Sequence, residues 1–465
     1  MTSVRTRFAP SPTGELHLGN VRTALYAAIL ARAEQGVFLL RIEDTDTTRS
    51  LAVHEASLMA DLSWLGIPWG EGPDRGGPYG PYRQSERAQH YAKFYARLEA
   101  EGHAYPCFCT EATLERHRTL QRLAGRPPRY PGTCAHLSRA ETNARQGTTV
   151  ALRLRVSPGL NLQFTDLVRG PQSFSSDDIG DFVIRRSDGS PAFMFANAID
   201  DSLMEVTHVL RGADHLSNTP RQLLILTLLG LPVPQYGHLS LILGADGAPL
   251  SKREGARSVR ELREAGYLPE AVLNHLVRLG HPYGDAGLLN LDGMAAGFAL
   301  SELGSAPARH DETALRHWQR EALAVTNWTT LWDWLPTEVH ALVPCHDREA
   351  FVAAVRPNLL LPADGAHWAR AIYSDELDLT VEARAVSTAA GGAFFRAALE
   401  VFASHGGEFK SFINELKKMT GMRGPELFHP IRAALTGALA GPELARLWNL
   451  IPPDSIRQRL LAGTR

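Results

Sequence analysis

Apolar positions near the N-terminus follow the pattern of a strand, a helix and a second strand. Thr6 to Ala9 is typical of a short strand, which the Pro- and Gly-rich residues 10–14 interrupt. From Gly19 to Ala33 apolar side chains recur mainly on one face, as in a helix, and the run VFLLRI at 37–42 suits a buried parallel strand. The pattern predicts a β-α-β unit.

The remaining apolar patterns predict a mixed region followed by a helical one. Helices are expected at 51–65, 87–102 and 219–229, and strands at 149–154, 164–168, 181–184, 204–210 and 239–243. Residues 257–303 and 321–465 follow helical patterns. Within the second range Phe409, Phe412, Leu416 and Met419 are expected on one helix face.

Length and composition fit a multidomain globular protein without a membrane span. The chain has 465 residues, which suggests two to four domains. Its longest apolar run, near Leu223 to Val233, is interrupted by Gly230 and is shorter than the roughly 18 residues that a span needs. Residues 1–8 lack the apolar core of a secretory signal, and four cysteines do not suggest a disulfide framework. A reducing cytoplasm is the expected location.

The formal net charge is −2, so the chain as a whole offers no positive field to an acidic polymer. A nucleic acid would have to meet local basic patches. The candidates are Arg116, Arg118, Arg122, Arg126 and Arg129, and later Lys410, Lys417 and Lys418. Such runs usually form only a solvated face, so they do not decide for nucleic-acid binding by themselves.

The first turn of the β-α-β unit is a candidate nucleotide site. Free amides at a helix N-terminus point to the crevice at the carboxyl ends of parallel strands, where phosphates are commonly held. His17 lies there and can donate to a phosphate oxygen, and Gly19 permits close approach of a ligand. The turn alone fits equally well a connection that binds nothing.

Cys107, Cys109, Cys134 and His136 form a C-x-C…C-x-H arrangement, a candidate structural zinc site. Zinc prefers four tetrahedral sulfur and nitrogen ligands, and two closely spaced pairs can clamp a loop with little core of its own. The intervening residues are polar and rich in Pro and Gly, as such a loop would be. The alternative is that these are ordinary reduced thiols, since C-x-C is less usual than C-x-x-C.

Several separated segments carry a family resemblance. PSPTGELHLGN at 10–20 with RIEDTD at 41–46 resembles the first signature of class I aminoacyl-tRNA synthetases in its glutamyl form, and LSKR at 250–253 resembles the second signature. VLRGADHLSNTPRQ at 209–222 and FHPIRAALTG at 428–437 are also similar to that family. The chain thus resembles the bacterial glutamyl-tRNA synthetase family over nearly its whole length.

The resemblance implies an α/β fold: a Rossmann-type class I synthetase catalytic domain with an α+β acceptor-binding insertion and an all-helical C-terminal anticodon-binding region. The implied divisions are 1–100 and 199–245 for the two catalytic halves, 101–198 for the insertion with its zinc site, 246–320 for a lysine-loop and helical stem-contact region, and 321–465 for the anticodon-binding region.

The resemblance also implies the activity, which is ATP-dependent ligation of L-glutamate to tRNA(Glu) through a glutamyl-adenylate, with release of diphosphate and AMP. Mg²⁺ would accompany ATP. Zn²⁺ would be structural, and its ligand positions occur in some members of the family and are lost in others. tRNA(Gln) is a second candidate substrate, and a monomer is the usual family state. No covalent nucleophile is required, since positioning and charge stabilisation can carry phosphoryl chemistry.

The candidate site residues follow from the family's motifs. The implied glutamate-binding residues are Arg7, Ala9, Ser11, Glu43, Phe193, Asn197 and Arg211. The implied ATP-binding residues are Pro10, His17, Gly19, Asn20, Leu250, Ser251, Lys252 and Arg253, of which His17, Gly19 and Lys252 are also catalytic. A lysine on a closing loop stabilises charge that develops on the phosphates. Outside this context, Glu43 could simply pair with Arg41, and Arg211 and Lys252 could be surface charges.

The sequence departs from the family at two positions. Phe193 stands where a tyrosine is usual, which removes a hydroxyl from the amino-acid pocket, and Pro249 replaces the first lysine of the second signature. Neither departure removes the chemistry.

Three alternatives stay open. A glutamyl-queuosine tRNA(Asp) synthetase shares the core but lacks a large C-terminal region, and length argues against it. A glutaminyl-tRNA synthetase usually has Glu where this chain has Ser11. A non-catalytic zinc-containing RNA-binding protein could be built on the same scaffold.

Overall fold

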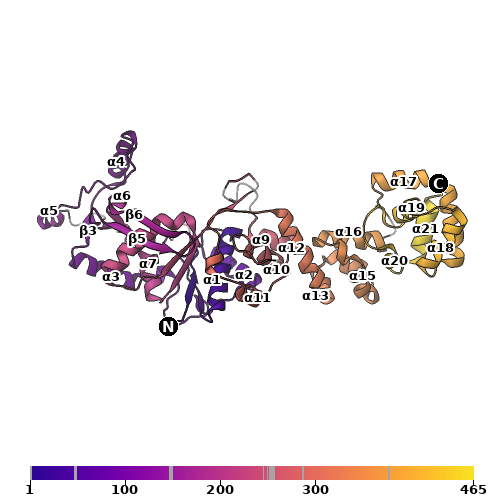
Figure 1. Ribbon diagram of the computed structural model, residues 1–465, viewed down its shortest axis with the longest axis horizontal. Helices are drawn as coiled ribbons and strands as arrows, with labels where there is room; N and C mark the ends of the chain where they lie inside the picture. The colour runs from indigo at the N-terminus through magenta and orange to yellow at the C-terminus, as the bar shows by residue number, and fades with distance from the viewer. Residues whose placement is uncertain are drawn as a thin grey trace. The chain divides into compact units, whose positions relative to one another are not determined.

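Four parallel strands form the sheet on which the first part of the chain is built (Figure 1). The computed structural model describes residues 3–46, 50–145, 150–244, 246–248, 250, 257–284, 287–374 and 377–464. The strands are β1 (Arg5–Phe8), β2 (Val37–Leu40), β8 (His208–Gly212) and β9 (Gln235–Leu239), in the order β2-β1-β8-β9. Helix α1 (Leu18–Ala33) joins β1 to β2 and buries Val21, Leu25 and Ile29, so the predicted β-α-β unit is confirmed.

Short helices and two short strands complete this part of the chain. They are α2 (Ala52–Trp64), α3 (Ala88–Ala100), α7 (Phe193–Leu203), α8 (Thr219–Leu228), β10 (Ile242–Leu243), α9 (Val259–Ala265), α10 (Pro269–Val277), α11 (Leu291–Ala296) and β11 (Ala308–Arg309). The expected strand at 204–210 begins only at His208, because α7 continues to Leu203. The expected strand at 239–243 is wrong in position: β9 ends at Leu239 and β10 begins at Ile242.

A second, antiparallel sheet lies within the predicted insertion. Its strands are β3 (Ala104–Cys107), β4 (Ala151–Leu154) and β7 (Phe182–Arg185), and β5 (Asn161–Asp166) forms a separate hairpin with β6 (Gly170–Ser175). The region also contains α4 (Glu111–Leu123), α5 (Arg139–Asn143) and α6 (Ser176–Ile179). Strands β3 and β6 were not expected.

Helix α4 corrects the expectation of a loop between the cysteine pairs. The Thr110 side chain caps it by accepting a hydrogen bond from the Thr113 amide, and none of its residues is buried. Its sequence is rich in charged residues, and its apolar side chains Leu120 and Leu123 are exposed, so the helix covers no core.

One apolar core joins the insertion to the parallel sheet's helices. It contains Tyr95 of α3, Leu152 of β4, Ile184 of β7, Phe195 of α7 and Ile225 of α8. The predicted boundary between residues 198 and 199 lies inside α7. The five-part division itself stays a prediction.

The contacts divide the chain into two units, Met1–Leu262 with Val272–Glu312, and Arg263–Ala271 with Thr313–Arg465. The second unit is helical, as predicted. Its helices are α12 (Glu312–Val325), α13 (Trp328–Trp334), α14 (Thr337–Leu342), α15 (Arg348–Val355), α16 (Pro362–Tyr373), α17 (Val381–His405, kinked at Gly391), α18 (Phe409–Thr420), α19 (Pro425–Thr436), α20 (Leu444–Trp448) and α21 (Pro453–Ala462).

The core of the second unit includes Phe351, Phe395, Phe412 and Leu416, whereas Met419, expected on the same helix face, is exposed. Among the described residues, no helix combines the length and apolarity that crossing a membrane requires.

Candidate active site

A cavity of about 640 Å³ lies at the carboxyl ends of β1 and β8. The predicted residues that line it are Arg7, Ala9, Pro10, Ser11, His17, Gly19, Asn20, Glu43, Phe193, Asn197 and Arg211. A second cavity, of about 390 Å³, shares several of these residues and adds Leu250. Ser251, Lys252, Arg253 and Pro249 lie outside the described residues. The structure therefore gathers every described member of the predicted glutamate and ATP sets.

The first turn places His17 at the N-terminus of α1. Its carbonyl accepts hydrogen bonds from the amides of Asn20 and Val21, and its backbone pairs with Ser258. A Cβ atom added at Gly19 would lie 3.3 Å from the His17 ring. Glycine at this position therefore leaves the imidazole room beside the helix start.

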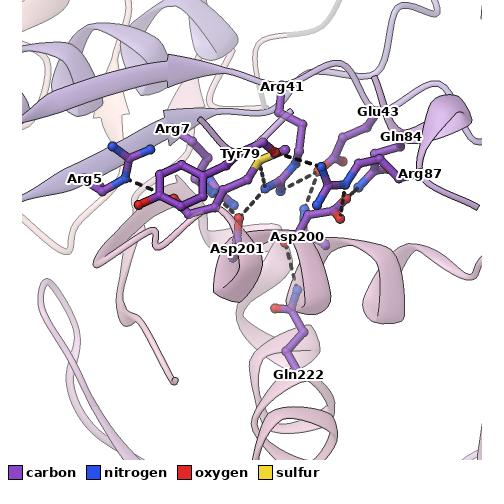
Figure 2. A network of polar contacts seen from close by, with 12 residues as sticks. Arg5, Arg7, Arg41, Glu43, Tyr79, Gln84, Arg87, Asp200, Asp201 and Gln222 are labelled. Atoms are coloured by element: carbon purple, nitrogen blue, oxygen red, sulfur yellow. Dashed lines mark hydrogen bonds and ion pairs between the residues drawn. The ribbon is translucent and has the colours of Figure 1, made fainter. Parts of the chain in front are cut away.

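A buried ion-pair network lies beside the cavity (Figure 2). Asp201 of α7 accepts from Arg41 Nη1 at 2.7 Å and from Arg7 Nε at 3.2 Å, and Arg41 Nη2 is 3.2 Å from Glu43 Oε1. Burial would raise the pKa of Asp201, but Arg41 and Arg7 outweigh it and lower that pKa. Glu43 therefore lines the cavity and also pairs with Arg41, which is the contact expected of it outside the family context.

Amide side chains extend the network to Arg211. Asn197 donates to Glu43 Oε1 and accepts from Gln222 Nε2 at 2.9 Å, and Gln222 Oε1 accepts from Arg211 Nη2 at 2.6 Å. Burial raises the pKa of Glu43, against the opposing effect of Arg41. An unbroken chain of polar contacts therefore runs from Arg7 to Arg211.

Arg211 is a buried cation without a carboxylate partner among the described residues. Its side chain donates to His238 Nε2 at 3.1 Å and to Thr219 Oγ1 at 2.8 Å, besides Gln222, and its guanidinium lies 5.0 Å from the centre of the Tyr236 ring. In the described part of the chain its buried Nη1 has no hydrogen-bond partner. Burial lowers the pKa of Arg211 to about 10.

Arg211 has no carboxylate in direct contact among the described residues. Glu43 and Asp201 pair with Arg41 and Arg7, and Asp166 reaches Arg211 only through His238. A buried cation is costly unless an anion compensates it. The arrangement suits a ligand carboxylate that contacts the Arg211 guanidinium at the cavity wall.

Phe193 stands at the start of α7 on the wall of the cavity. Its ring lies 5.3 Å from that of His215, centre to centre. Phe193 therefore gives this wall an aromatic ring, as a tyrosine would, but no hydroxyl.

Three of the four predicted zinc ligands lie together. The Sγ atoms of Cys107, Cys109 and Cys134 are all within 4.8 Å of one another, whereas His136 is exposed and is not brought to this group. The Tyr130 hydroxyl lies 3.5 Å from Cys107 Sγ and 3.7 Å from Cys109 Sγ. Burial, with Cys107 and Cys134 nearby, raises the pKa of Cys109 to about 11. A cation would hold all three as thiolates, so the set fits a metal ion.

Sequence reasoning missed the residues that support the cavity. Asp201, Thr219 and Gln222 hold Arg7 or Arg211, and His238 does so from β9. Thr219 and Gln222 lie in the quoted segment 209–222, so closer use of that segment could have found them. His238 carried no such signal.

Comparison with known proteins agrees with the fold and the site. Residues 3–317 match the family described as tRNA synthetases class I (E and Q), catalytic domain, and residues 337–464 match the family described as anticodon binding domain. The first part of the chain is thus a class I synthetase catalytic domain.

Individual relatives narrow this class. Glutamate–tRNA ligase 2 of Nitrosococcus oceani is 56% identical over 461 residues, covering 99% of this chain and 98% of that protein. Glutamate–tRNA ligase 2 of Alkalilimnicola ehrlichii is 53% identical, covering 99% and 97%. A crystal structure of a glutamate tRNA ligase from Elizabethkingia meningosepticum in complex with its amino acid has a TM-score of 0.91 at 28% identity and covers 99% of both chains. The chain belongs to the glutamate–tRNA ligase family.

Proposed function

We propose that the protein ligates L-glutamate to tRNA(Glu) in two steps, with glutamyl-adenylate as the intermediate. The observation that carries the proposal is Arg211, a buried cation that lines the cavity and has no direct carboxylate partner in the described part of the chain, where its Nη1 has no hydrogen-bond partner either. Glutamate has a side-chain carboxylate that could pair directly with this guanidinium in a charge-assisted bond. Glutamine would offer only a neutral carbonyl oxygen there.

In this proposal Arg211 and Arg7 bind the substrate's carboxylates, and Glu43 with Asn197 binds its ammonium group. Ala9, Ser11 and Phe193 shape the remaining wall. All of these residues line the same cavity. The glutamate α-carboxylate then attacks the α-phosphorus of ATP in line and diphosphate leaves, after which a hydroxyl of the terminal adenosine of tRNA displaces AMP.

ATP is proposed to bind on the side of His17, Gly19 and Asn20, with Mg²⁺ on its phosphates. Lys252 is proposed to approach those phosphates. Support comes from the described residues on either side of its segment: the Leu250 amide donates to the Ile242 carbonyl, and Ser258 pairs with His17. Leu250 and Ser258, which lie on either side of this segment, are therefore both held by residues that line the cavity.

A structural zinc ion is proposed at Cys107, Cys109 and Cys134. The fourth ligand is either His136, as the sequence predicts, or the Tyr130 hydroxyl, which lies next to two of the thiols. The ion would fix the polypeptide between β3 and β4 at the side of the insertion sheet.

tRNA is proposed to contact the helical unit as well as the insertion. A cavity of about 580 Å³ in the helical unit is lined by polar and basic side chains, among them Asn414, Lys417, Lys418 and Arg423. Arg118 and Arg122 of the insertion form ion pairs with Glu115, so part of the predicted basic patch is neutralised. A monomeric state and a cytoplasmic location stay predictions.

ATP–diphosphate exchange with purified protein tests the proposal. With tRNA(Glu) present, glutamate should support exchange, and glutamine and aspartate should not. Exchange with another amino acid but not with glutamate would refute the proposed substrate. Charging of separately purified tRNA(Glu) and tRNA(Gln) shows whether the second is also a substrate.

A further inference from the structure

Arg211 is oriented by a residue on the neighbouring strand. Arg211 of β8 and His238 of β9 are paired across the parallel strands, and Arg211 Nε donates to His238 Nε2 at 3.1 Å. His238 is fully buried, and its Nδ1 lies 2.5 Å from Asp166 Oδ2. A line of three polar side chains therefore runs from Asp166 through His238 to Arg211.

The neighbours of His238 fix its protonation. Arg211 Nε can only donate, so His238 Nε2 must accept, and the carboxylate of Asp166 can only accept, so Nδ1 must carry the hydrogen. Asp166 is itself held, because its Oδ1 accepts from the amides of His238, Val168 and Arg169. These bonds outweigh burial and lower the pKa of Asp166. Burial in turn lowers the pKa of His238.

We propose that His238, held by Asp166 in its Nδ1–H form, is a positioning residue that fixes the Arg211 guanidinium in the orientation that binds the substrate carboxylate. With Nε on His238 and Nη2 on Thr219 and Gln222, the planar guanidinium has one orientation at the cavity wall, and its Nη1 has no partner among the described residues. This inference rests on the proposed function, since it assumes that Arg211 binds glutamate.

Asp166 comes from a different part of the fold than Arg211. It ends β5 in the hairpin of the insertion, and the next residue, Leu167, donates its amide to the Tyr236 carbonyl of β9. Phe164 of the same hairpin packs edge-on against Tyr236. The hairpin is thus attached to β9 at the point where His238 meets Arg211.

Two substitutions of His238 and one of Asp166 separate positioning from general damage. His238→Gln can still offer an oxygen to Arg211 Nε, whereas His238→Leu cannot. Asp166→Asn keeps the size of the side chain and its backbone bonds but turns an amide N–H toward His238 Nδ1. The hydrogen would then move to Nε2, where it opposes Arg211 Nε. His208→Gln is the matched control, since His208 lies on β8 and bonds to Thr207, away from the cavity.

We expect His238→Leu and Asp166→Asn to raise the KM for glutamate roughly 10- to 100-fold in exchange with tRNA present, with a smaller change in kcat. His238→Gln should recover most of the loss, and His208→Gln should match the wild type. The KM for ATP should change little in all four, and thermal unfolding should change little in His238→Gln and His208→Gln, whereas His238→Leu also leaves buried polar groups unpaired. A KM for glutamate within twofold of wild type in His238→Leu, or equal damage in the Gln and Leu variants, would overturn the inference.

A spectrum of ¹⁵N-histidine-labelled protein gives a reading that does not depend on the substrate. The His238 signal, assigned by its loss in His238→Gln, should be that of the Nδ1–H form and should change to the Nε2–H form in Asp166→Asn. An Nε2–H form in the wild type would overturn the positioning inference even if glutamate is activated. Failure of the wild type to activate glutamate would instead refute the proposed function.

Discussion

Replacing Arg211 should weaken glutamate binding far more than any other property of the protein. Nη2 and Nε are already engaged by Thr219, Gln222 and His238, and Nη1 has no partner among the described residues, so the guanidinium at the cavity wall keeps one hydrogen bond for a ligand. One hydrogen bond to a charged group contributes about 1.5–3 kcal/mol, which corresponds to roughly 10- to 150-fold in KM. Arg211→Ala should therefore raise the KM for glutamate by that factor. Arg211→Lys should lie between, because an ammonium group keeps the charge but cannot occupy all three positions of the fork.

The assay is ATP–diphosphate exchange at saturating tRNA(Glu), with glutamate varied, together with direct measurement of tRNA binding. tRNA affinity should be unchanged in both variants, since Arg211 is buried at the amino-acid end of the cavity. Arg32→Ala is the control, because Arg32 lies near the end of α1 in an exposed pair with Asp292. Equal losses of tRNA and glutamate binding, or a KM for glutamate within threefold of wild type, would show that Arg211 does not contact the substrate.

Three further outcomes are expected. Lys252→Ala should slow adenylate formation by roughly 10²–10³, because one donor worth ~3–4 kcal/mol in the transition state is removed. ATP affinity and transfer from preformed adenylate should change little, and a defect confined to transfer would refute this role. Elemental analysis should find one zinc ion per chain in the wild type and none in Cys109→Ser. Comparing the zinc content of His136→Ala and Tyr130→Phe should identify the fourth ligand. Wild-type protein without zinc would refute the site. His275, buried 2.8 Å from His310, has its pKa lowered to about 3 by burial, so the unfolded chain takes up a proton below pH 6.5 that the folded chain does not. This residue should therefore lower the free energy of unfolding by about 2 kcal/mol between pH 6.5 and pH 5. In denaturant unfolding, the free energy of His275→Asn should depend less steeply on pH than that of the wild type. An equally steep dependence would refute the lowered pKa of His275.

The cavity-lining residues could be predicted from the resemblance to the family's motifs, and the sheet gives the physical reason why they meet. Arg7 and Arg211 come from β1 and β8, and the carboxyl ends of parallel strands meet at one edge of a sheet. Glu43 follows β2 at the same edge. The family's motifs therefore named residues that the parallel sheet brings together, whereas each residue alone would have been read as an ordinary surface or paired charge.

The supporting residues could not be predicted in the same way. The strand expected at 239–243 begins one residue after His238, so its register with Arg211 was hidden, and Asp166 reaches His238 only through the packing of a hairpin. His136, which the C-x-H spacing suggests as a ligand, is exposed and lies apart from the three thiols, so its role stays a prediction. Contacts between distant segments depend on tertiary packing that periodicity does not report.

Helix α7 belongs to two structures at once. Phe195 and Ile199, four residues apart, enter the core that the insertion shares with α3 and α8, while Asn197 and Asp201, also four apart, enter the polar network of the pocket. We therefore expect that exchanging the insertion alone would disturb the pocket. A chimera that takes the insertion from a relative should keep its amino-acid pocket only if α7 is exchanged with it, and the two regions should unfold in one cooperative transition.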